Sequence, residues 1–115
     1  MPRNMSFAIT TEQIKNRTKT VTRRDGWIDL KQGEIINAVE KCMGLKKGEK
    51  MKVLCQFKVI KVTREKLLFI TPDEVLKEGF TNTTQVQFID MFCKSHKGLH
   101  PYSLITRIEF EYINN

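Results

Sequence analysis

The sequence lacks the cysteine and histidine patterns that hold disulfides or metal ions. Its three cysteines, Cys42, Cys55 and Cys93, are odd in number and far apart, and no Cys-x-x-Cys pair occurs. The two histidines, His96 and His100, have no partner at zinc-ligand spacing, and they fit a helix cap and a loop. These absences argue against a disulfide framework and a structural zinc site, and they favour buried free thiols in a reducing compartment. We expect no metal and no cofactor.

Long hydrophobic runs are also missing. The apolar runs span at most five residues, which is too short for a transmembrane helix or for the hydrophobic region of a secretory signal. The sequence has no internal repeat, low-complexity segment or linker. We therefore expect no membrane association, a cytoplasmic location, a single domain over residues 1–115 and, by default, a monomer.

The whole chain has a net charge of +7, and acidic residues are scarce in its first two-thirds. Residues 1–25 carry six Lys and Arg against two acids, and residues 31–66 carry ten against four. From Leu67 onward the balance is four against six. This asymmetry favours a polyanionic partner, above all nucleic acid. The lysines of residues 46–52 also fit a turn and a strand that they merely solvate.

Hydrophobic periodicity predicts about six short strands. They are Met5–Ile9, Thr20–Arg24, Ile35–Val39, Met51–Val62, Leu67–Ile70 and Leu104–Tyr112. The apolar parity switches at Val59-Ile60, which predicts a β-bulge where the sheet curls. The strands do not alternate regularly with helices, so the pattern indicates an α+β fold: a small, mostly antiparallel curled barrel with two or three helices in its connections.

The helices have recognisable starting signals. Thr10 and Gln13 have capping-box spacing ahead of a brief first helix. Thr71 followed by Pro72 begins a second helix, which stops at Gly79. Thr83 or Thr84 opens a longer third helix, with an apolar stripe of Val86, Ile89, Phe92 and Cys93.

Residues 18–24 carry the strongest functional signal. The segment holds one Lys, two Arg and three hydroxyls, and only Val21 could serve a core. On a strand, Thr20, Thr22 and Arg24 would share one face, with Val21 and Arg23 on the other and Lys19 just before them. Hydroxyls beside a guanidinium suit a phosphate, a carboxylate or the polar edge of a nucleobase. An exposed edge strand is the alternative, because threonine is a good strand former.

Two separated motifs resemble a known family. The Lys-Thr-x-Thr-x-Arg pattern of Lys19–Arg24 and the Glu-Gly-Phe element of Glu78–Phe80 together resemble the ASCH domain, a relative of the PUA fold. The likeness runs over nearly the whole chain, but it departs at two positions. Arg17 stands where a small residue is usual, and Arg23 stands where an apolar residue is usual, which puts the strand register in question.

The resemblance implies a PUA-like barrel that binds RNA or a modified nucleoside in a basic cleft. Small bacterial members of the family include amidohydrolases that remove the acetyl group from N4-acetylcytidine, and the implied catalytic residues are Lys19, Thr22 and Glu78. We place the remaining candidates among the ligand-binding residues: Thr20, Arg23, Arg24, Arg17 and Trp27. Trp27 also fits the core, and Glu78 also fits a purely structural ion pair with Arg23 or Arg24.

Three classes of function therefore remain open. The first is binding of RNA or a nucleoside without turnover, and the second is hydrolysis of an acylated cytidine. For the second, the positive potential of two arginines should lower the pKa of Lys19 and supply a neutral amine as a base. Ribonuclease activity is a weaker form of the second class, since residues 18–24 contain no pair of histidines. The third is a regulatory or interaction module that uses the lysines of residues 46–52.

Overall fold

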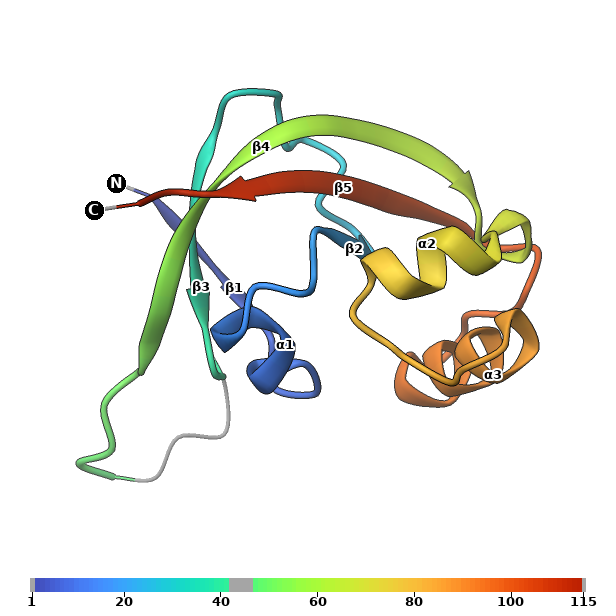
Figure 1. The fold of residues 1–115 in the computed structure, drawn as a ribbon, viewed down its shortest axis with the longest axis horizontal. Coiled ribbons are helices and arrows are strands. Elements are labelled where there is room, and N and C mark those ends of the chain that lie inside the picture. The colour runs from blue at the N-terminus through green and yellow to red at the C-terminus, as the bar shows by residue number, and fades with distance from the viewer. Residues whose placement is uncertain (1, 42–46, 115) are drawn as a thin grey trace.

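The computed structural model describes residues 2–41 and 47–114. Its elements follow one another as β1 (Arg3–Ser6), α1 (Thr11–Lys15), β2 (Val21–Arg24), β3 (Ile35–Val39), β4 (Val53–Lys66), the 3-10 turn η1 (Leu67–Phe69), α2 (Pro72–Lys77), α3 (Gln85–Ser95) and β5 (Leu104–Tyr112). The strands form a sheet of five in the order β1-β3-β4-β5-β2, so β2 is an edge strand (Figure 1). Cys42 and Lys46 lie outside the described residues.

The expected curled α+β fold is confirmed, with corrections to its strands. All neighbouring strands are antiparallel except β1 and β3, which run parallel. The register of β4 against β5 shifts between Val59 and Lys61, at the bulge that the parity switch predicted. The described part of the chain has five strands where about six were expected, because Leu67–Ile70 forms a 3-10 turn. The Ile70 N–H bonds back to the Leu67 carbonyl, so the chain turns directly into α2.

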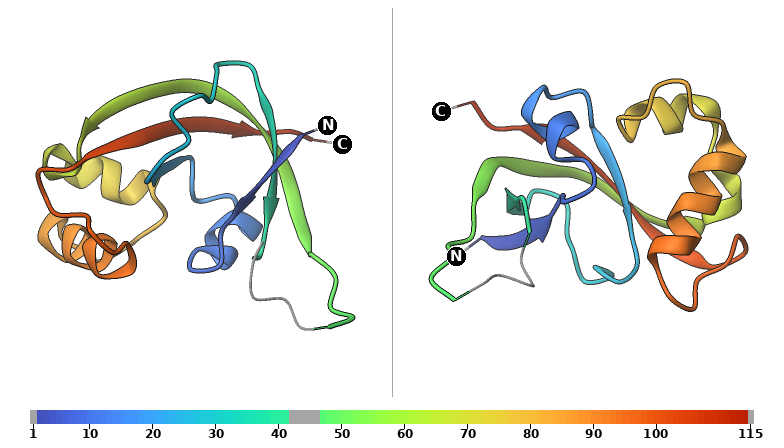
Figure 2. Two further views of the ribbon diagram at one scale, coloured as in Figure 1. Left: turned by 180° about the vertical axis from the view of Figure 1, so that it is seen from behind. Right: turned by 90° about the horizontal axis from the view of Figure 1, so that it is seen from below.

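Two hydrophobic clusters lie at opposite ends of the long β4–β5 ribbon. The first lies between α1 and the curled sheet and contains Met5, Phe7, Ile14, Leu30, Ile36, Ala38, Phe57, Val59, Ile108 and Phe110. The second lies under α2 and α3 and contains Leu67, Ile70, Val75, Phe88, Phe92 and Ile105. Figure 2 shows α1 and the α2–α3 pair held apart in both of its views. The edge strand β2 therefore runs between two separately packed bodies.

The starts of α2 and α3 follow their sequence signals, but the start of α1 does not. The Thr71 side chain accepts a hydrogen bond from the Glu74 N–H, and Thr84 with Gln87 forms a complete capping box. Thr10 makes no side-chain cap, so the capping box expected there is wrong. The expected stripe on α3 is also partly wrong, because Val86 is 76% exposed and Phe88 is buried instead.

Candidate functional site

A cavity of about 200 Å³ lies beside the edge strand β2. One wall is the segment from Ser6 to Thr10 that joins β1 to α1, and the other wall comes from α3 and the turn after α2. Charged and hydroxyl side chains converge on it from β2, the residue before it and the turn after α2, namely Lys19, Thr22, Arg23, Arg24 and Glu78, and the walls add the hydroxyls of Ser6, Thr10 and Ser95. Aromatic rings and a methionine supply the apolar part of the lining, from Phe7, Phe80, Phe88, Met91 and Phe92. The cavity thus combines flat apolar walls with a polar floor.

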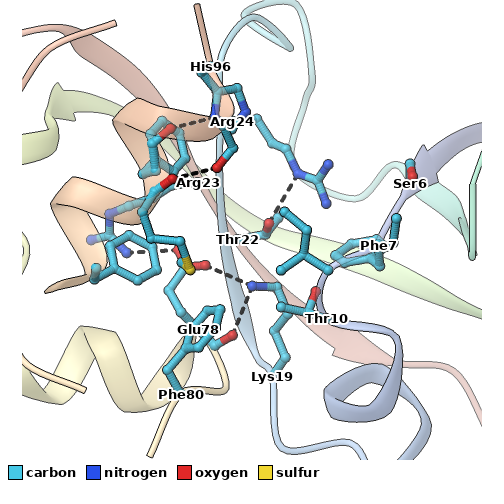
Figure 3. A pocket seen from close by; sticks show the side chains of 16 residues that line it. Ser6, Phe7, Thr10, Lys19, Thr22, Arg23, Arg24, Glu78, Phe80 and His96 are labelled. Carbon is cyan, nitrogen blue, oxygen red and sulfur yellow. Dashed lines mark hydrogen bonds and ion pairs between the residues drawn. The ribbon is translucent and has the colours of Figure 1, made fainter.

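Strand alternation in β2 explains how one short segment supplies most of the floor. Thr22 and Arg24 lie two residues apart and share a face. The Thr22 hydroxyl accepts a 3.1 Å hydrogen bond from Arg24 Nε, and the Arg24 guanidinium lies 4.5 Å from the centre of the Phe7 ring (Figure 3). The side chain between them, Arg23, is turned toward a group of carboxylates. Thr22 and Arg24 therefore face the cavity as a hydrogen-bonded pair.

Lys19 and Glu78 form a buried ion pair at the centre of the floor. Lys19 Nζ donates to Glu78 Oε1 at 2.7 Å and to the Glu78 carbonyl at 2.9 Å, and both side chains are 3% exposed. Backbone bonds place them together, since the Thr20 N–H donates to the Lys77 carbonyl and ties the start of β2 to the end of α2. Gly79 then turns the chain with φ +97°. This junction brings together two residues that lie far apart in the sequence.

Arg23 holds the other side of the Glu78 carboxylate. Its guanidinium donates to Glu78 Oε2 at 3.1 Å, to Glu74 at 2.9 Å and to Glu65 at 3.0 Å. Arg107 also donates to the Glu74 carboxylate. Lys19 therefore holds one oxygen of the Glu78 carboxylate and Arg23 holds the other. The ion pair with Arg23, expected as a purely structural alternative, exists together with the contact to Lys19.

Burial and neighbouring charges shift the pKa values of Lys19 and Glu74. Burial lowers the pKa of the Lys19 amine, and the adjacent Glu78 carboxylate partly opposes that shift. The hydrogen bond from Arg107 lowers the pKa of Glu74 to about 2. The site therefore holds one amine whose charged form is disfavoured by burial, hydrogen-bonded to the Glu78 carboxylate.

The other three residues expected to bind ligand lie away from the cavity lining. Thr20 is exposed, and its carbonyl pairs with the Phe110 N–H of β5. Arg17 is exposed with φ +61°, and its guanidinium lies 5.3 Å from the centre of the Tyr112 ring. Trp27 packs against the first hydrophobic cluster, as in the core interpretation of this residue.

Sequence reasoning missed the wall that α3 provides. Phe88 and Phe92 lie one helical turn apart, and His96 follows at the same spacing, so all three share a face toward the cavity. This spacing could have predicted the wall, but the prediction followed an overlapping apolar stripe that begins at Val86.

The free thiols Cys55 and Cys93 are only half-buried, in contrast to the expected burial.

Neither a metal-binding cluster nor a membrane-spanning helix occurs among the described residues. Across residues 2–41 and 47–114, no three His, Cys, Asp or Glu side chains gather where they could hold a metal ion. In the same part of the chain, no helix has the length and apolar character needed to cross a membrane.

Solved structures of low sequence identity share this fold. An ASCH domain from Lactobacillus crispatus JV V101 matches with a TM-score of 0.66 and 13% identity, over 96% of this chain and 78% of that one. A DUF984 protein from Enterococcus faecalis V583 matches with a TM-score of 0.62 and 14% identity, over 98% and 76% of the two chains. No family model and no curated protein matches the sequence. At these identities the likeness concerns the fold alone, and the expected ASCH-type fold is confirmed.

Proposed function

We propose that this ASCH-type protein binds a pyrimidine nucleoside, free or as one residue of an RNA strand, with its base in the cavity beside β2. The observation that carries the proposal is the convergence of Lys19, Thr22 and Glu78 on one buried floor between aromatic walls. A cytosine edge presents both acceptors and an amino donor. The floor offers the matching groups, because Lys19 donates, Glu78 accepts and the Thr22 hydroxyl does either.

The size and charge of the cavity support a single base. Its volume of about 200 Å³ is below the roughly 300–1,000 Å³ of sites for drug-sized ligands. Phe80, which is partly exposed, can pack against the face of a flat ring, as aromatic side chains do with unstacked bases. Lys19 is balanced by Glu78, and Arg23 by Glu65, Glu74 and Glu78. Arg24 adds a positive charge on the cavity side of β2, which favours a phosphate-bearing strand.

The two threonines of the motif provide a matched test. Thr22 lines the cavity and Thr20 does not, although both lie in the same short segment. Calorimetric titration with cytidine, uridine and adenosine should show binding of the pyrimidines, and Thr22→Val should weaken it by about tenfold, the loss of roughly one hydrogen bond. Thr20→Val should bind like the wild type. Absence of pyrimidine binding at millimolar concentration, or equal losses in both variants, would contradict the proposal.

A second candidate function, hydrolysis of an N-acylated cytidine, is favoured by the 2.7 Å contact between Lys19 Nζ and Glu78. Glu78 can take a proton from the Lys19 ammonium group, whose pKa is lowered by burial. The neutral amine then accepts a proton from a water molecule, and the resulting hydroxide attacks the acyl carbonyl carbon. The Arg24 guanidinium stabilises the oxyanion, and as the carbon–nitrogen bond breaks, Glu78 gives its proton to the departing amine nitrogen. If the Thr22 hydroxyl attacks instead, the acetyl group passes to Thr22 as an ester, and a water molecule activated in the same way releases acetate from it.

Chromatography separates this candidate from simple binding. The wild type incubated with N4-acetylcytidine should release cytidine and acetate in equal amounts, and Lys19→Ala should abolish the release. If N4-acetylcytidine stays intact while cytidine binds measurably, the binding function is supported and the hydrolase function is contradicted. Undiminished release by Lys19→Ala would remove the role of Lys19 as base.

A further inference from the structure

His96 is held in one orientation by its own helix. It forms the C-cap of α3, and its imidazole folds back over the last turn. The Nδ1 atom lies 2.9 Å from the Phe92 carbonyl oxygen, and the ring stacks on the Phe92 ring at 4.2 Å between centroids with an interplanar angle of 18°. A hydrogen bond and a stacked ring together leave the imidazole little freedom to rotate.

This geometry determines what His96 offers to a ligand. A carbonyl oxygen only accepts hydrogen bonds, so Nδ1 must carry the proton that joins it to Phe92. In the neutral imidazole the second nitrogen, Nε2, is then a hydrogen-bond acceptor. A group that donates a hydrogen bond, such as a hydroxyl, matches this nitrogen, whereas a phosphate oxygen does not.

The cavity has a buried end and an open end. Lys19, Thr22 and Glu78 are 2–3% exposed and form the closed end. Ile9 is 66% exposed, and Ser95 is also exposed, so these residues mark the mouth. Figure 3 shows His96 on the far side of Thr22 from Lys19, toward Arg24. His96 therefore belongs to the open half of the cavity.

We infer that His96 recognises a sugar hydroxyl of the bound ligand, and that the ligand is a nucleoside rather than a free base. The inference rests on the proposed binding function. With the base against the buried floor, the hydrophilic sugar lies at the mouth, where its hydroxyls keep contact with water. A 2′- or 3′-hydroxyl donates to His96 Nε2.

The test compares cytidine with 2′,3′-dideoxycytidine by calorimetric titration. The wild type should bind cytidine about tenfold more tightly, as expected for one hydrogen bond. His96→Phe keeps the stack on Phe92 but has no acceptor, so it should bind both ligands at the dideoxy level. His96→Asn, whose amide oxygen can accept, should regain part of the preference. His100→Phe is the matched control outside the cavity lining and should behave like the wild type.

The outcomes separate this inference from the function on which it rests. If the wild type binds neither ligand, the proposed function fails. If His96→Phe retains the preference for cytidine, or if it weakens both ligands equally, the assignment of His96 to the sugar is overturned and the binding function stands. Circular dichroism melting of each variant identifies a fold defect, and in that case the His96→Asn result decides the question.

Discussion

Arg23→Met should reveal how strongly the charged group behind the cavity depends on one side chain. The Arg23 side chain is 1% exposed, and three carboxylates, from β4, α2 and the turn after α2, share its guanidinium at 2.9 to 3.1 Å. Methionine fills much of the same space without charge. The change therefore leaves Glu65, Glu74 and Glu78 with their negative charges and fewer partners.

The size of the effect follows from what each carboxylate retains. Removing one partner of a buried ion pair costs about 3–5 kcal/mol of folding free energy. Glu78 keeps Lys19 and Glu74 keeps Arg107, which places the expected loss near the lower limit. Glu65 is 33% exposed and adds little, because exposed pairs contribute about 0–1 kcal/mol. We expect a loss of about 3 kcal/mol from a total that is typically about 5–15 kcal/mol.

Urea unfolding at pH 7 measures this loss directly. With a slope of about 1–3 kcal/mol per molar urea, the midpoint should fall by about 1–3 M. The difference from the wild type should shrink as the pH falls below about 4.5, since Glu74, whose pKa the hydrogen bonds from Arg107 and Arg23 keep low, becomes protonated and loses the benefit of these partners. Glu65→Gln serves as control and should cost about 1 kcal/mol or less. A stability within about 0.5 kcal/mol of the wild type for Arg23→Met would refute the reasoning, because it lies within the effect of ordinary surface changes.

Two further changes probe the same region. The hydrogen bond from Arg107 lowers the pKa of Glu74 from 4.5 to about 2, so this carboxylate contributes stability above about pH 4.5 that is lost as the pH falls toward 2. Glu74→Gln should cost about 1–2 kcal/mol at pH 7 after allowance for solvent screening, and the gap should close in acid; a gap constant down to pH 2.5 in urea titrations would contradict this. Gly79→Ala should lower the melting temperature more than Gly98→Ala, because both have φ near +90° but only at Gly79 would a Cβ meet Gln13, at 2.7 Å. Equal losses in the two variants would show that the contact relaxes freely.

Short-range rules explain which features could be predicted from sequence. The caps at Thr71 and Thr84 need only a hydroxyl and an N–H three residues later. The bulge near Val59 follows from a change of parity within one strand. The Lys19–Arg24 motif together with Glu78 was visible because its residue types are unusual for a core, and the structure brings Lys19 and Glu78 into contact.

Longer-range packing explains what the sequence did not reveal. On α3, the stripe from Val86 and the stripe through Phe88 both have helical spacing, and only the position of α2 and the sheet selects the second. At the start of α1, the Thr11 hydroxyl donates to the Phe7 carbonyl, while Thr10 takes φ −116° and ψ 30° instead of the extended conformation of a typical N-cap. In both cases tertiary contacts outweigh a weak local preference.

The most instructive case is Arg23, whose charge stands where an apolar residue was expected and so put the strand register in question. The register is regular, and the arginine is accommodated because Glu65, Glu74 and Glu78 surround it. Its bond to Glu78 Oε2 leaves Oε1 for Lys19, so the carboxylate that faces the cavity has a fixed orientation. Because side chains alternate along β2, Thr22 faces the cavity, while the next residue, Arg23, points to the other side and orients the Glu78 carboxylate. It follows that Arg23→Met should weaken cytidine binding even under conditions where the variant is fully folded, whereas Glu65→Gln should not.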